Sequence, residues 1–311
     1  MPANTLPQKQ VSQTSRRAAI FDLLLVLVPI VSAILWKTYS SETMESPNVT
    51  VHVSDSKANV APAAGSFVAE ASKRAISERG RFVIALSGGS LPKLLAAGLV
   101  GDESVEWSKW HVFFADERIV PLDDKDSNYL GCDDVLFSKV PIPRNQIYPL
   151  DPTLGPVDCA KSYEGMLTNL FGIGEDIVFD LIMLGMGPDG HTASLFPGHQ
   201  LLEENNLWVA SIVDSPKPPP KRITLTLRTI SHAHQVAFVA AGAGKTETLV
   251  EVLMTASVVI PHENKSCLYK RESDGVLLPS SIVQKVSKET HWFVDKDAAN
   301  NLLQKCASAK Y

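Results

Sequence analysis

Short apolar runs alternate with helix-like patterns along most of the chain. Four of these runs, at residues 81–86, 110–115, 179–184 and 236–241, are almost continuously apolar and end at polar residues or glycines. Such runs are typical of strands that are buried on both faces of a parallel sheet. A shorter alternating run at 49–53 predicts one further strand ahead of them.

Helical patterns lie between these predicted strands. Apolar residues recur at helical spacing over 64–76, which predicts a helix that begins after Asp55 and ends near Gly80. Further helices are predicted over 91–100 and 246–254. The alternation of strands and helices predicts an α/β fold, with a Rossmann-like, mainly parallel sheet that carries helices on both faces.

Each of the four apolar strands runs into a loop that is rich in polar residues or glycine. These loops are residues 87–90, 116–118, 185–198 and 242–245. In open parallel sheets, ligands bind at the carboxyl ends of the strands, in the crevice where the winding reverses. The four loops are therefore expected to meet at one edge of the sheet and to form one active site.

The first of these loops has the sequence SGGS and joins a predicted strand to a predicted helix. Gly88 and Gly89 allow a tight turn after Ser87. N–H groups at the start of a helix carry partial positive charge and bind phosphate well. Ser87, Gly88 and Gly89 are therefore candidates for binding a phosphate group, and the alternative is a tight turn that binds nothing.

The last loop places Lys245 after two glycines and before a predicted helix. The phosphate loop of NTPases needs a glycine five residues before its Gly-Lys pair. Here that position is Val239, inside a predicted strand, so an ATPase interpretation fails. A shorter turn still presents one ammonium group to one phosphate, and the alternative for Lys245 is a solvated surface lysine.

Three charged residues, Asp116, Glu117 and Arg118, directly follow a long apolar strand. Charge close to a core is costly unless it is paired or belongs to a site. These residues are therefore candidates for substrate contact, and a salt-bridged loop is the alternative. The acidic run that follows, 123–128, does not have the spacing of a calcium-binding loop, and we expect a solvated turn that caps a helix.

The loop at 185–198 carries the clearest catalytic pattern, GMGPDGHTASLFPG. Three glycines surround Asp189 and His191, which stand two residues apart. A carboxylate at this spacing orients an imidazole or raises its basicity, and histidine, with an ordinary pKa of about 6.5, suits a general base at neutral pH. The sequence therefore predicts His191 as the catalytic base.

Several other classes of protein are excluded or disfavoured. The chain contains neither the GxSxG motif of serine hydrolases nor the HExxH motif of zinc enzymes. Its net charge of −5 gives no indication of nucleic-acid binding. The four cysteines form no CxxC pair, so neither metal-ligand spacing nor a disulfide scaffold is indicated, and we interpret them as free thiols.

The first 45 residues fall outside the strand–helix alternation and are predicted to be a leader to a catalytic domain at 46–311. Residues 1–19 have no acidic side chains, and an apolar segment follows at 20–36. Its uninterrupted part is shorter than the about 20 residues that a membrane-spanning helix needs. A signal-peptide core, a marginal anchor and an organelle-targeting extension all fit, as does a variable leader that a start at Met44 would bypass. The catalytic domain is expected in the cytoplasm, with membrane contact only through 20–36.

The motifs at 87–90, at 116–121 with Ser127 and Asn128, and at 185–198 together make the chain similar to the 6-phosphogluconolactonases. The similarity extends from about Val49 to the C-terminal helix. It implies a phosphosugar lactone as substrate, hydrolysed to 6-phosphogluconate in the oxidative pentose phosphate pathway. It also implies a fold shared with the glucosamine-6-phosphate deaminases, and neither a metal nor an organic cofactor. An oligomeric state is not indicated.

The same resemblance implies roles for individual residues. His191 would activate the attacking water, and Asp189 would orient His191 or the substrate. The residues implied to bind the substrate or its phosphate are Ser87, Gly88, Gly89, Asp116, Arg118, Arg222 and Lys245. Among these, Lys245 would bind the phosphate, Arg118 would meet the polar edge of the substrate, and Arg222, which opens a predicted strand at 222–227, would be a second phosphate ligand.

Three alternative functions remain at this stage. A glucosamine-6-phosphate deaminase would need a further acidic residue shortly after the histidine, where this chain has Ser194 to Pro197 and no carboxylate. A non-catalytic sugar-phosphate-binding protein would keep Lys245 and the glycines but would not need Asp189 and His191 together. A membrane-tethered scaffold is suggested only by the apolar segment of the leader.

Overall fold

A computed structural model of the chain describes residues 48–255, 258–262, 265–269 and 277–308. By their contacts, residues 47–311 form a single unit. The predicted leader and its apolar segment lie outside the described residues. Among the residues that are described, no helix combines the length and the apolar character that a membrane crossing requires.

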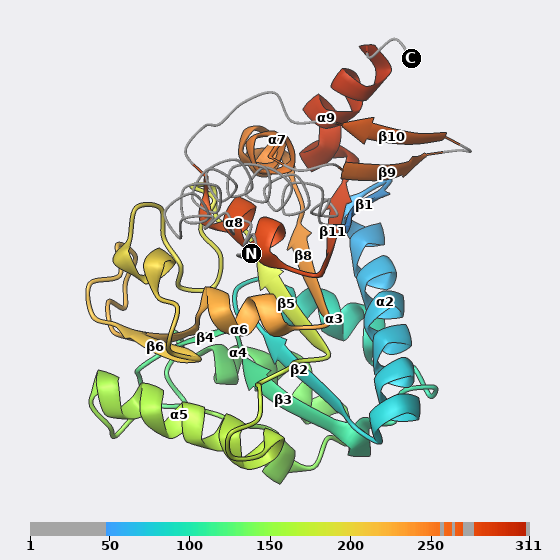
Figure 1. The fold of residues 1–311 in the computed structure, drawn as a ribbon. Coiled ribbons are helices and arrows are strands. Elements are labelled where there is room, and N and C mark those ends of the chain that lie inside the picture. Colours follow the sequence, from blue (N-terminus) through green and yellow to red (C-terminus); the bar gives the residue numbers. More distant parts are fainter. Residues whose placement is uncertain (1–47, 256–257, 263–264, 270–276, 309–311) are drawn as a thin grey trace, which may run out of the picture. The chain divides into compact units, whose positions relative to one another are not determined.

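Eight strands form the main sheet of the described unit (Figure 1). They are β1 (Asn48–Ser54), β2 (Phe82–Leu86), β3 (Trp110–Phe114), β5 (Leu181–Gly185), β8 (Gln235–Ala240), β9 (Val258–His262), β10 (Lys265–Tyr269) and β11 (Glu289–Asp295). Their order across the sheet is β10-β9-β1-β11-β8-β5-β2-β3, and all pairs are parallel except β10 with β9. The four apolar runs therefore became β2, β3, β5 and β8, which are neighbours in the sheet.

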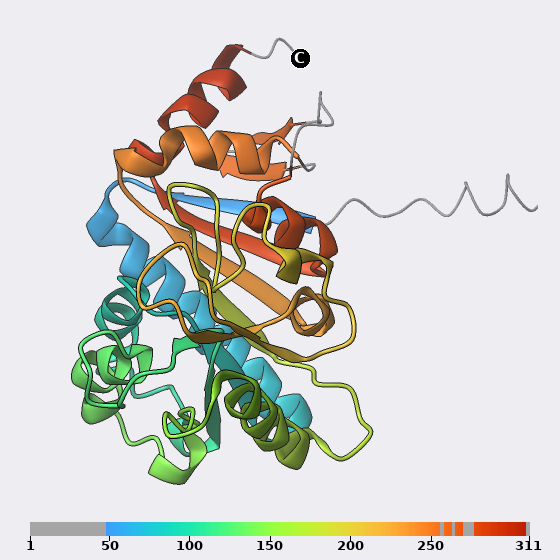
Figure 2. The same cartoon turned by 90° about the vertical axis from the view of Figure 1, so that its left-hand side faces the viewer.

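The apolar runs are continuous because both faces of these strands are covered. Phe82, Ile84 and Leu86 of β2 pack into one buried cluster, while Val83 and Ala85 pack into the other. Helices α2 (Lys57–Arg79), α3 (Leu91–Leu99) and α4 (Asn128–Val135) contribute to the first cluster. Helices α5 (Pro156–Phe171), α6 (Leu227–His232), α7 (Thr246–Leu253), α8 (Pro279–Val286) and α9 (Lys296–Ser308) contribute to the second. The prediction of a mainly parallel sheet with helices on both faces is confirmed (Figures 1 and 2).

Helix α2 shows how local sequence sets these boundaries. It ends at Gly80, which has φ +73° and whose backbone N–H closes the last turn on the carbonyl of Ile76 at 2.8 Å. Glycine adopts this left-handed conformation without the strain that a side chain would bring. The remaining short helices are 3-10 turns: η1 (Trp107–Lys109), η2 (Phe137–Lys139), η3 (Arg144–Gln146), η4 (Gln200–Glu203) and η5 (Ala243–Lys245).

A second sheet, which the sequence did not predict, lies outside the main one. Its strands are β4 (Asp116–Arg118), β6 (Val209–Ile212) and β7 (Arg222–Leu225), paired antiparallel in the order β4-β7-β6. Two expectations are corrected here. Residues 116–118 form a strand and not a loop, and the strand predicted over 222–227 stops at Leu225 because Thr226 caps the start of α6.

The winding of the main sheet reverses between β2 and β5. From β2 the chain moves to β3 at one edge, and it then crosses to β5 and continues through β8 in the other direction. Loops that follow strands on either side of such a reversal diverge and leave a crevice for a ligand. The loops after β2 and β5, which contain Ser87–Gly89 and Asp189–His191, flank this point.

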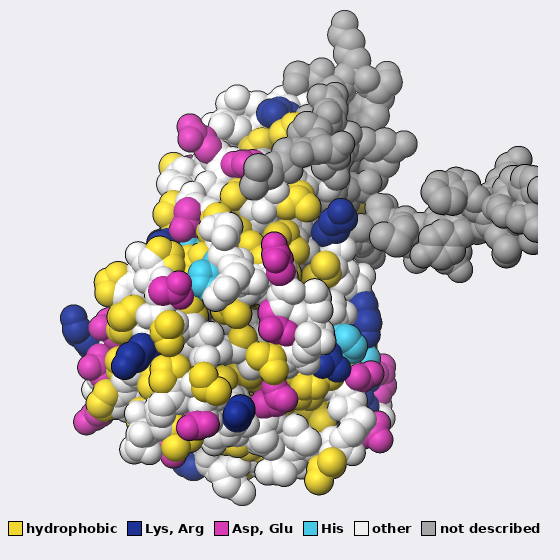
Figure 3. Space-filling view, turned by 60° about the vertical axis from the view of Figure 1, so that its left-hand side comes forward, with side chains coloured by type: hydrophobic (Ala, Val, Ile, Leu, Met, Phe, Trp, Pro, Cys, Tyr) yellow, Lys and Arg dark blue, Asp and Glu magenta, His cyan; other side chains and the backbone are white. Residues whose placement is uncertain are grey.

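Charged side chains of both signs are visible on one face of this unit. On the face shown in Figure 3, the Lys and Arg side chains of the described residues lie scattered among acidic and hydrophobic ones. Two of the four cysteines, Cys132 and Cys159, are free thiols buried in the two clusters. The side chains of Cys267 and Cys306 lie outside the description.

Candidate active site

The loop after β5 folds back on itself around Gly187. The backbone N–H of Gly187 donates to the carbonyl of His191 at 2.9 Å, and that of Gly190 donates to the carbonyl of Gly187 at 3.0 Å. A Cβ atom added at Gly187 would lie 1.9 Å from Nδ1 of His191 and 2.5 Å from Oδ1 of Asp189. Glycine is therefore required here, because the imidazole and the carboxylate pack directly against the backbone of the loop.

His191 and Asp189 are in direct contact. Nδ1 of His191 lies 2.5 Å from Oδ1 of Asp189, and the imidazole stacks on the ring of Phe196 with 5.0 Å between ring centroids. Burial alone would raise the pKa of Asp189, but hydrogen bonds from His191 and Lys217 and the charge of the imidazole hold it at about 2. Asp189 is therefore ionised, and the shared proton belongs to Nδ1.

This proton arrangement leaves Nε2 of His191 with its lone pair. No hydrogen bond from the described residues reaches Nε2. The pKa of His191 is lowered from its ordinary value by burial and by the charge of Lys217, against the opposing carboxylates of Asp189 and Asp116. At neutral pH the imidazole is neutral, and a neutral imidazole with a free lone pair has the form that a general base needs.

Lys217 joins this pair, and the sequence analysis did not identify it. Its Nζ lies 3.1 Å from Oδ1 of Asp189 and 3.0 Å from Nδ1 of His191. Because Nδ1 carries a proton, the ammonium group donates to the carboxylate and lies beside the ring as a charge. Lys217 stands in the segment 215–220, SPKPPP, which contains no catalytic or binding motif. The signal in the sequence that could have indicated a role for Lys217 is its position as the one charged residue in a stiff, proline-rich segment.

Lys245 lies on the other side of the same loop. Its Nζ donates to the carbonyl of Met186 at 2.7 Å, just after the end of β5. Burial and the charge of Lys217 lower the pKa of Lys245, while Asp189 raises it. An ammonium group has three donors, so two remain available to a ligand. The ammonium group of Lys245 thus contacts the loop that carries Asp189 and His191, and its role in binding phosphate stays a prediction.

The loop after β2 combines buried and open positions. The hydroxyl of Ser87 is buried and has no hydrogen-bond partner among the described residues. A Cβ at Gly88 would lie 1.8 Å from the amide oxygen of Asn128, and Gly89 has φ +70° with open space beside it. Ser90 makes no side-chain cap on α3, so the first N–H groups of this helix keep donor capacity. These features suit an anion.

Asp116, Ser194 and Arg222 form a buried group next to the catalytic pair. The hydroxyl of Ser194 donates to Oδ2 of Asp116 at 2.8 Å, and Nη1 of Arg222 lies 3.9 Å from the same oxygen. Ala193, just before Ser194, has φ +48°, which is uncommon for a residue with a side chain. The other donors of Arg222 bind backbone carbonyls of residues 217–219. The phosphate contact expected for Arg222 stays a prediction.

Arg118 and Glu117 follow Asp116 in β4 and bind the segment at the start of α4. Nη1 of Arg118 donates to the carbonyl of Asp126 at 2.9 Å, while its Nε has no partner among the described residues. Glu117 is fully buried, and burial raises its pKa to about 7 although backbone N–H groups of residues 118, 128 and 129 donate to it. Glu117 thus ties β4 to the start of α4, where Ser127 is the N-cap.

Asn128 completes the link between the two glycine-containing loops of the site. Its amide nitrogen donates to the carbonyl of Asp116 at 2.8 Å, and its amide oxygen lies where a side chain at Gly88 would be. A contact chain thus runs from Gly88 through Asn128 and Asp116 to Ser194. The residues joined by these contacts all lie in segments that follow the carboxyl ends of β2, β3 and β5. The polar loops after these strands therefore lie together at one edge of the sheet, as predicted.

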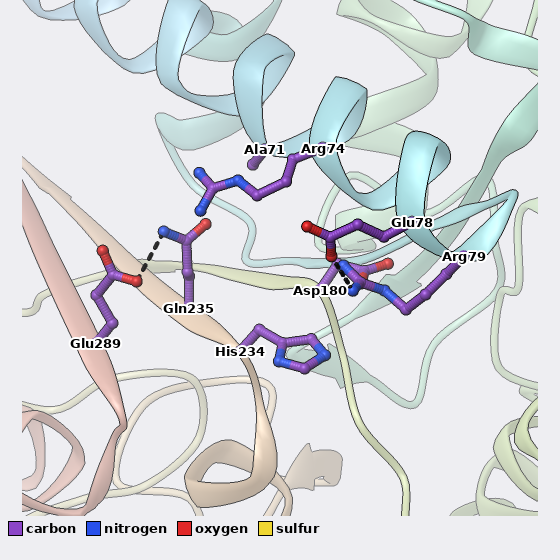
Figure 4. A pocket seen from close by; sticks show the side chains of 8 residues that line it. All are labelled: Ala71, Arg74, Glu78, Arg79, Asp180, His234, Gln235 and Glu289. Atoms are coloured by element: carbon purple, nitrogen blue, oxygen red, sulfur yellow. Dashed lines mark hydrogen bonds and ion pairs between the residues drawn. The ribbon is translucent and has the colours of Figure 1, made fainter.

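The opposite edge of the main sheet has a separate cavity of about 270 Å³ (Figure 4). Its lining residues are Ala71, Arg74, Glu78, Arg79, Asp180, His234, Gln235 and Glu289. Most of its charged groups are paired with one another, as in the ion pair of Arg79 with Asp180 at 2.9 Å. Among the described residues, no three or more His, Cys, Asp or Glu gather in a way that could hold a metal ion.

Comparison with known proteins agrees with this architecture. A sequence model of the family described as glucosamine-6-phosphate isomerases/6-phosphogluconolactonase matches residues 55–292. The chain therefore belongs to this family. A monomeric glucosamine-6-phosphate deaminase shares its fold, with a TM-score of 0.63 at 17% identity.

Within the family, the similarity is to proteins named 6-phosphogluconolactonase. A probable 6-phosphogluconolactonase of Schizosaccharomyces pombe is 45% identical over 254 residues, covering 78% of this chain and 92% of the relative. The human 6-phosphogluconolactonase is 42% identical over 211 residues, covering 64% of this chain and 82% of the relative. The structure of the Trypanosoma brucei 6-phosphogluconolactonase has a TM-score of 0.68 at 27% identity and covers 83% of this chain and all of that one.

Proposed function

We propose that this protein hydrolyses 6-phosphogluconolactone to 6-phosphogluconate, the lactone-opening step of the oxidative pentose phosphate pathway. Its relatives with this name support the choice of substrate. The observation that carries the proposal is the contact of 2.5 Å between His191 and Asp189, because it leaves Nε2 of a neutral imidazole free at the carboxyl edge of the sheet.

The chemistry follows from that proton arrangement. Nε2 of His191 removes a proton from water while the water oxygen attacks the lactone carbonyl carbon, and Asp189 stabilises the imidazolium that forms. The tetrahedral oxyanion then collapses, and the bond from this carbon to the ring oxygen breaks. The imidazolium returns its proton to the ring oxygen, which becomes a hydroxyl. One water is consumed, and one carboxylic acid and one hydroxyl are formed.

The phosphate of the substrate would fix the lactone for this attack. We assign it to Lys245, with its two available donors, and to the loop of Ser87, Gly88 and Gly89 at the start of α3. Binding a remote charged group holds the reacting carbon near the base and removes much of the entropic barrier. Asp116 and Arg118 would meet the polar edge of the sugar.

The deaminase alternative has less support from the site. Ser194 occupies a position where that chemistry would call for a nearby acid, and its hydroxyl is bound to Asp116. Purified full-length protein should therefore accelerate hydrolysis of freshly prepared 6-phosphogluconolactone above the buffer rate and leave glucosamine 6-phosphate unchanged. The His191→Ala protein, prepared in the same way, is the matched control. A buffer-level rate for the lactone would refute the proposal, and release of ammonia from the amino sugar would favour the alternative.

The leader requires a separate proposal. We propose that residues 1–43 direct or anchor the protein in the cell and take no part in catalysis, which the catalytic unit at 46–311 performs. Relatives from rice carry the designation chloroplastic in their names, which supports a role in targeting. Imaging of fluorescent fusions with and without residues 1–43 tests this, because an unchanged distribution would remove the targeting role.

A further inference from the structure

Arg222 is nearly completely buried, with 3% of its surface exposed. Its Nε donates to the carbonyl of Pro219 at 2.9 Å, and its Nη2 donates to the carbonyls of Lys217 at 2.7 Å and Pro218 at 3.1 Å. Its Nη1 lies 3.4 Å from the hydroxyl of Ser194. A guanidinium has five N–H donors, so most of them are committed to protein oxygens.

The segment that Arg222 binds is stiffened by its prolines but has few backbone donors of its own. Of the six residues at 215–220, four are prolines, which have no backbone N–H to donate. The hydroxyl of Ser215 donates to the carbonyl of Lys217 at 2.8 Å, and the backbone N–H of Ser215 donates to the carbonyl of Pro220 at 3.2 Å. The planar fork of Arg222 therefore supplies the donors for three successive carbonyls, a geometry that lysine does not reproduce.

The other end of this segment is the ammonium group of Lys217, which lies against Asp189 and His191. We propose that Arg222 is a positioning residue that fixes the backbone of residues 217–219 and thereby holds the charge of Lys217 beside the catalytic imidazole. Burial is the main cause that lowers the pKa of His191, and the charge of Lys217 lowers that pKa further. This proposal rests on the proposed function in one respect: it takes His191 to be the catalytic base.

The charged groups that face His191 come from several elements. Asp189 lies on its own loop, Asp116 on β4 and Lys217 on the proline-rich segment, and Lys245 adds its charge close to Lys217 and Asp189. Arg222 contacts two of these groups: it binds the backbone that carries Lys217, and its Nη1 lies 3.9 Å from Oδ2 of Asp116. The side chain of Lys217 is 39% exposed, so its position depends on its backbone anchor rather than on packing around the ammonium group.

NMR titration of the His191 imidazole in the substrate-free, full-length protein tests this arrangement. Lys217→Met removes the positive charge, and we expect the pKa of His191 to rise by about one unit, since nearby charges commonly shift pKa values by this order. Arg222→Lys keeps a positive charge beside Asp116 but lacks the fork. We expect it to raise the pKa in the same direction by about half as much, because Lys217 is no longer held.

The double variant Lys217→Met/Arg222→Lys should titrate like Lys217→Met alone, since Arg222 acts through Lys217. Lys221→Met, an exposed lysine of the same segment, is the matched control and should leave the pKa of His191 unchanged. An unshifted His191 in folded Arg222→Lys, or a further shift in the double variant, would overturn the proposal. If Arg222 binds phosphate, Arg222→Lys would raise KM for the phosphorylated lactone without moving the titration.

The titration also separates this proposal from the proposed activity. It reports the coupling between Arg222, Lys217 and His191 whether or not the protein hydrolyses a lactone. In the kinetic profile, the acid limb of kcat/KM should move with the titration in each variant. A shift seen by NMR without a matching movement in the rate profile would retain the coupling and remove His191 as the base.

Discussion

At the amino-terminal edge of the main sheet, Asp180 accepts hydrogen bonds from the backbone N–H of Val83 at 2.7 Å and from Nε of Arg79 at 2.9 Å. Gln235 donates to Glu289 at 3.0 Å on the far side of the same cavity (Figure 4). At the carboxyl edge, Asp189, His191 and Lys217 are also in contact. There, however, Nε2 of His191 and two donors of Lys245 face no protein partner among the described residues.

Composition does not distinguish the two clusters, since each contains a histidine, carboxylates and cations. They differ in how a carboxylate is used. Asp180 is paired on both oxygens with Arg79 and a backbone N–H, whereas Asp189 orients an imidazole whose Nε2 stays open. Buried polar groups that pair with each other connect elements and stabilise the fold, whereas groups held in place but left incomplete are available to a substrate. The placement of an open acceptor beside an ionised carboxylate, and not the number of charges, distinguishes the carboxyl edge from the amino-terminal edge.

The largest effect should follow from removing the base. His191→Ala should lower kcat for lactone hydrolysis by about 10²–10⁴-fold, the usual range for loss of a general base, with the thermal midpoint little changed. Lactone hydrolysis is followed against the spontaneous rate at each pH. If this variant kept full turnover, Nε2 of His191 would have no catalytic role. The difference between the two edges of the sheet would then not mark the active site.

Lys245→Met should have the next largest effect, and on binding rather than turnover. We expect KM for the phosphorylated lactone to rise by about tenfold to a hundredfold, because a charge-assisted contact to phosphate is lost. An unphosphorylated gluconolactone serves as the comparison substrate, and its hydrolysis should hardly change. Equal effects on the two substrates would show that Lys245 does not recognise the phosphate.

At the opposite edge, Asp180→Asn should affect stability and not the reaction. Asp180 is buried and its hydrogen bonds are to a cation and a backbone N–H. Their loss should cost about 2 kcal/mol, which corresponds to a fall of roughly 4–8 °C in the thermal midpoint. Scanning calorimetry and kcat/KM measured well below the midpoint separate the two readouts. A large loss of kcat/KM in the folded variant would contradict the division between the edges.

The smallest effect on the reaction is expected from replacing His234, the histidine that lines the cavity at the amino-terminal edge. Burial lowers the pKa values of both His191 and His234 below the ordinary 6.5. Since the base must be neutral, the acid limb of kcat/KM should lie below pH 6.5, with activity lost as the pH falls through the pKa of His191. His234→Ala should leave this limb and the rate unchanged within about twofold. A displaced limb would show that the two edges are coupled.

Much of the fold could be predicted from the sequence because the signal is local. The four apolar runs mark strands that are buried on both faces, and each polar loop directly follows its strand. The second sheet could not be predicted in this way, since Asp116–Arg118 is short and charged, and it pairs with a strand about a hundred residues later. A three-residue strand has no periodicity to detect.

The site shows the same division. Asp189 and His191 lie in one loop, so their contact followed from spacing and from the glycine at 187. Lys217 reaches them only because Arg222, five residues later, turns its fork onto the backbone of residues 217–219. That role depends on folded geometry and has no signal in the sequence, where Arg222 is predicted only as a phosphate ligand.

Gly187 carries no reactive group, yet its backbone is the surface on which the imidazole of His191 and the carboxylate of Asp189 rest. In a map of mutational tolerance made by saturating the loop with substitutions, position 187 should be as restrictive as position 191. Natural variants at position 187 should lose activity although none of the reactive side chains has been replaced. Selection on this enzyme should therefore also act on position 187, where the absence of a Cβ atom leaves room for the imidazole and the carboxylate.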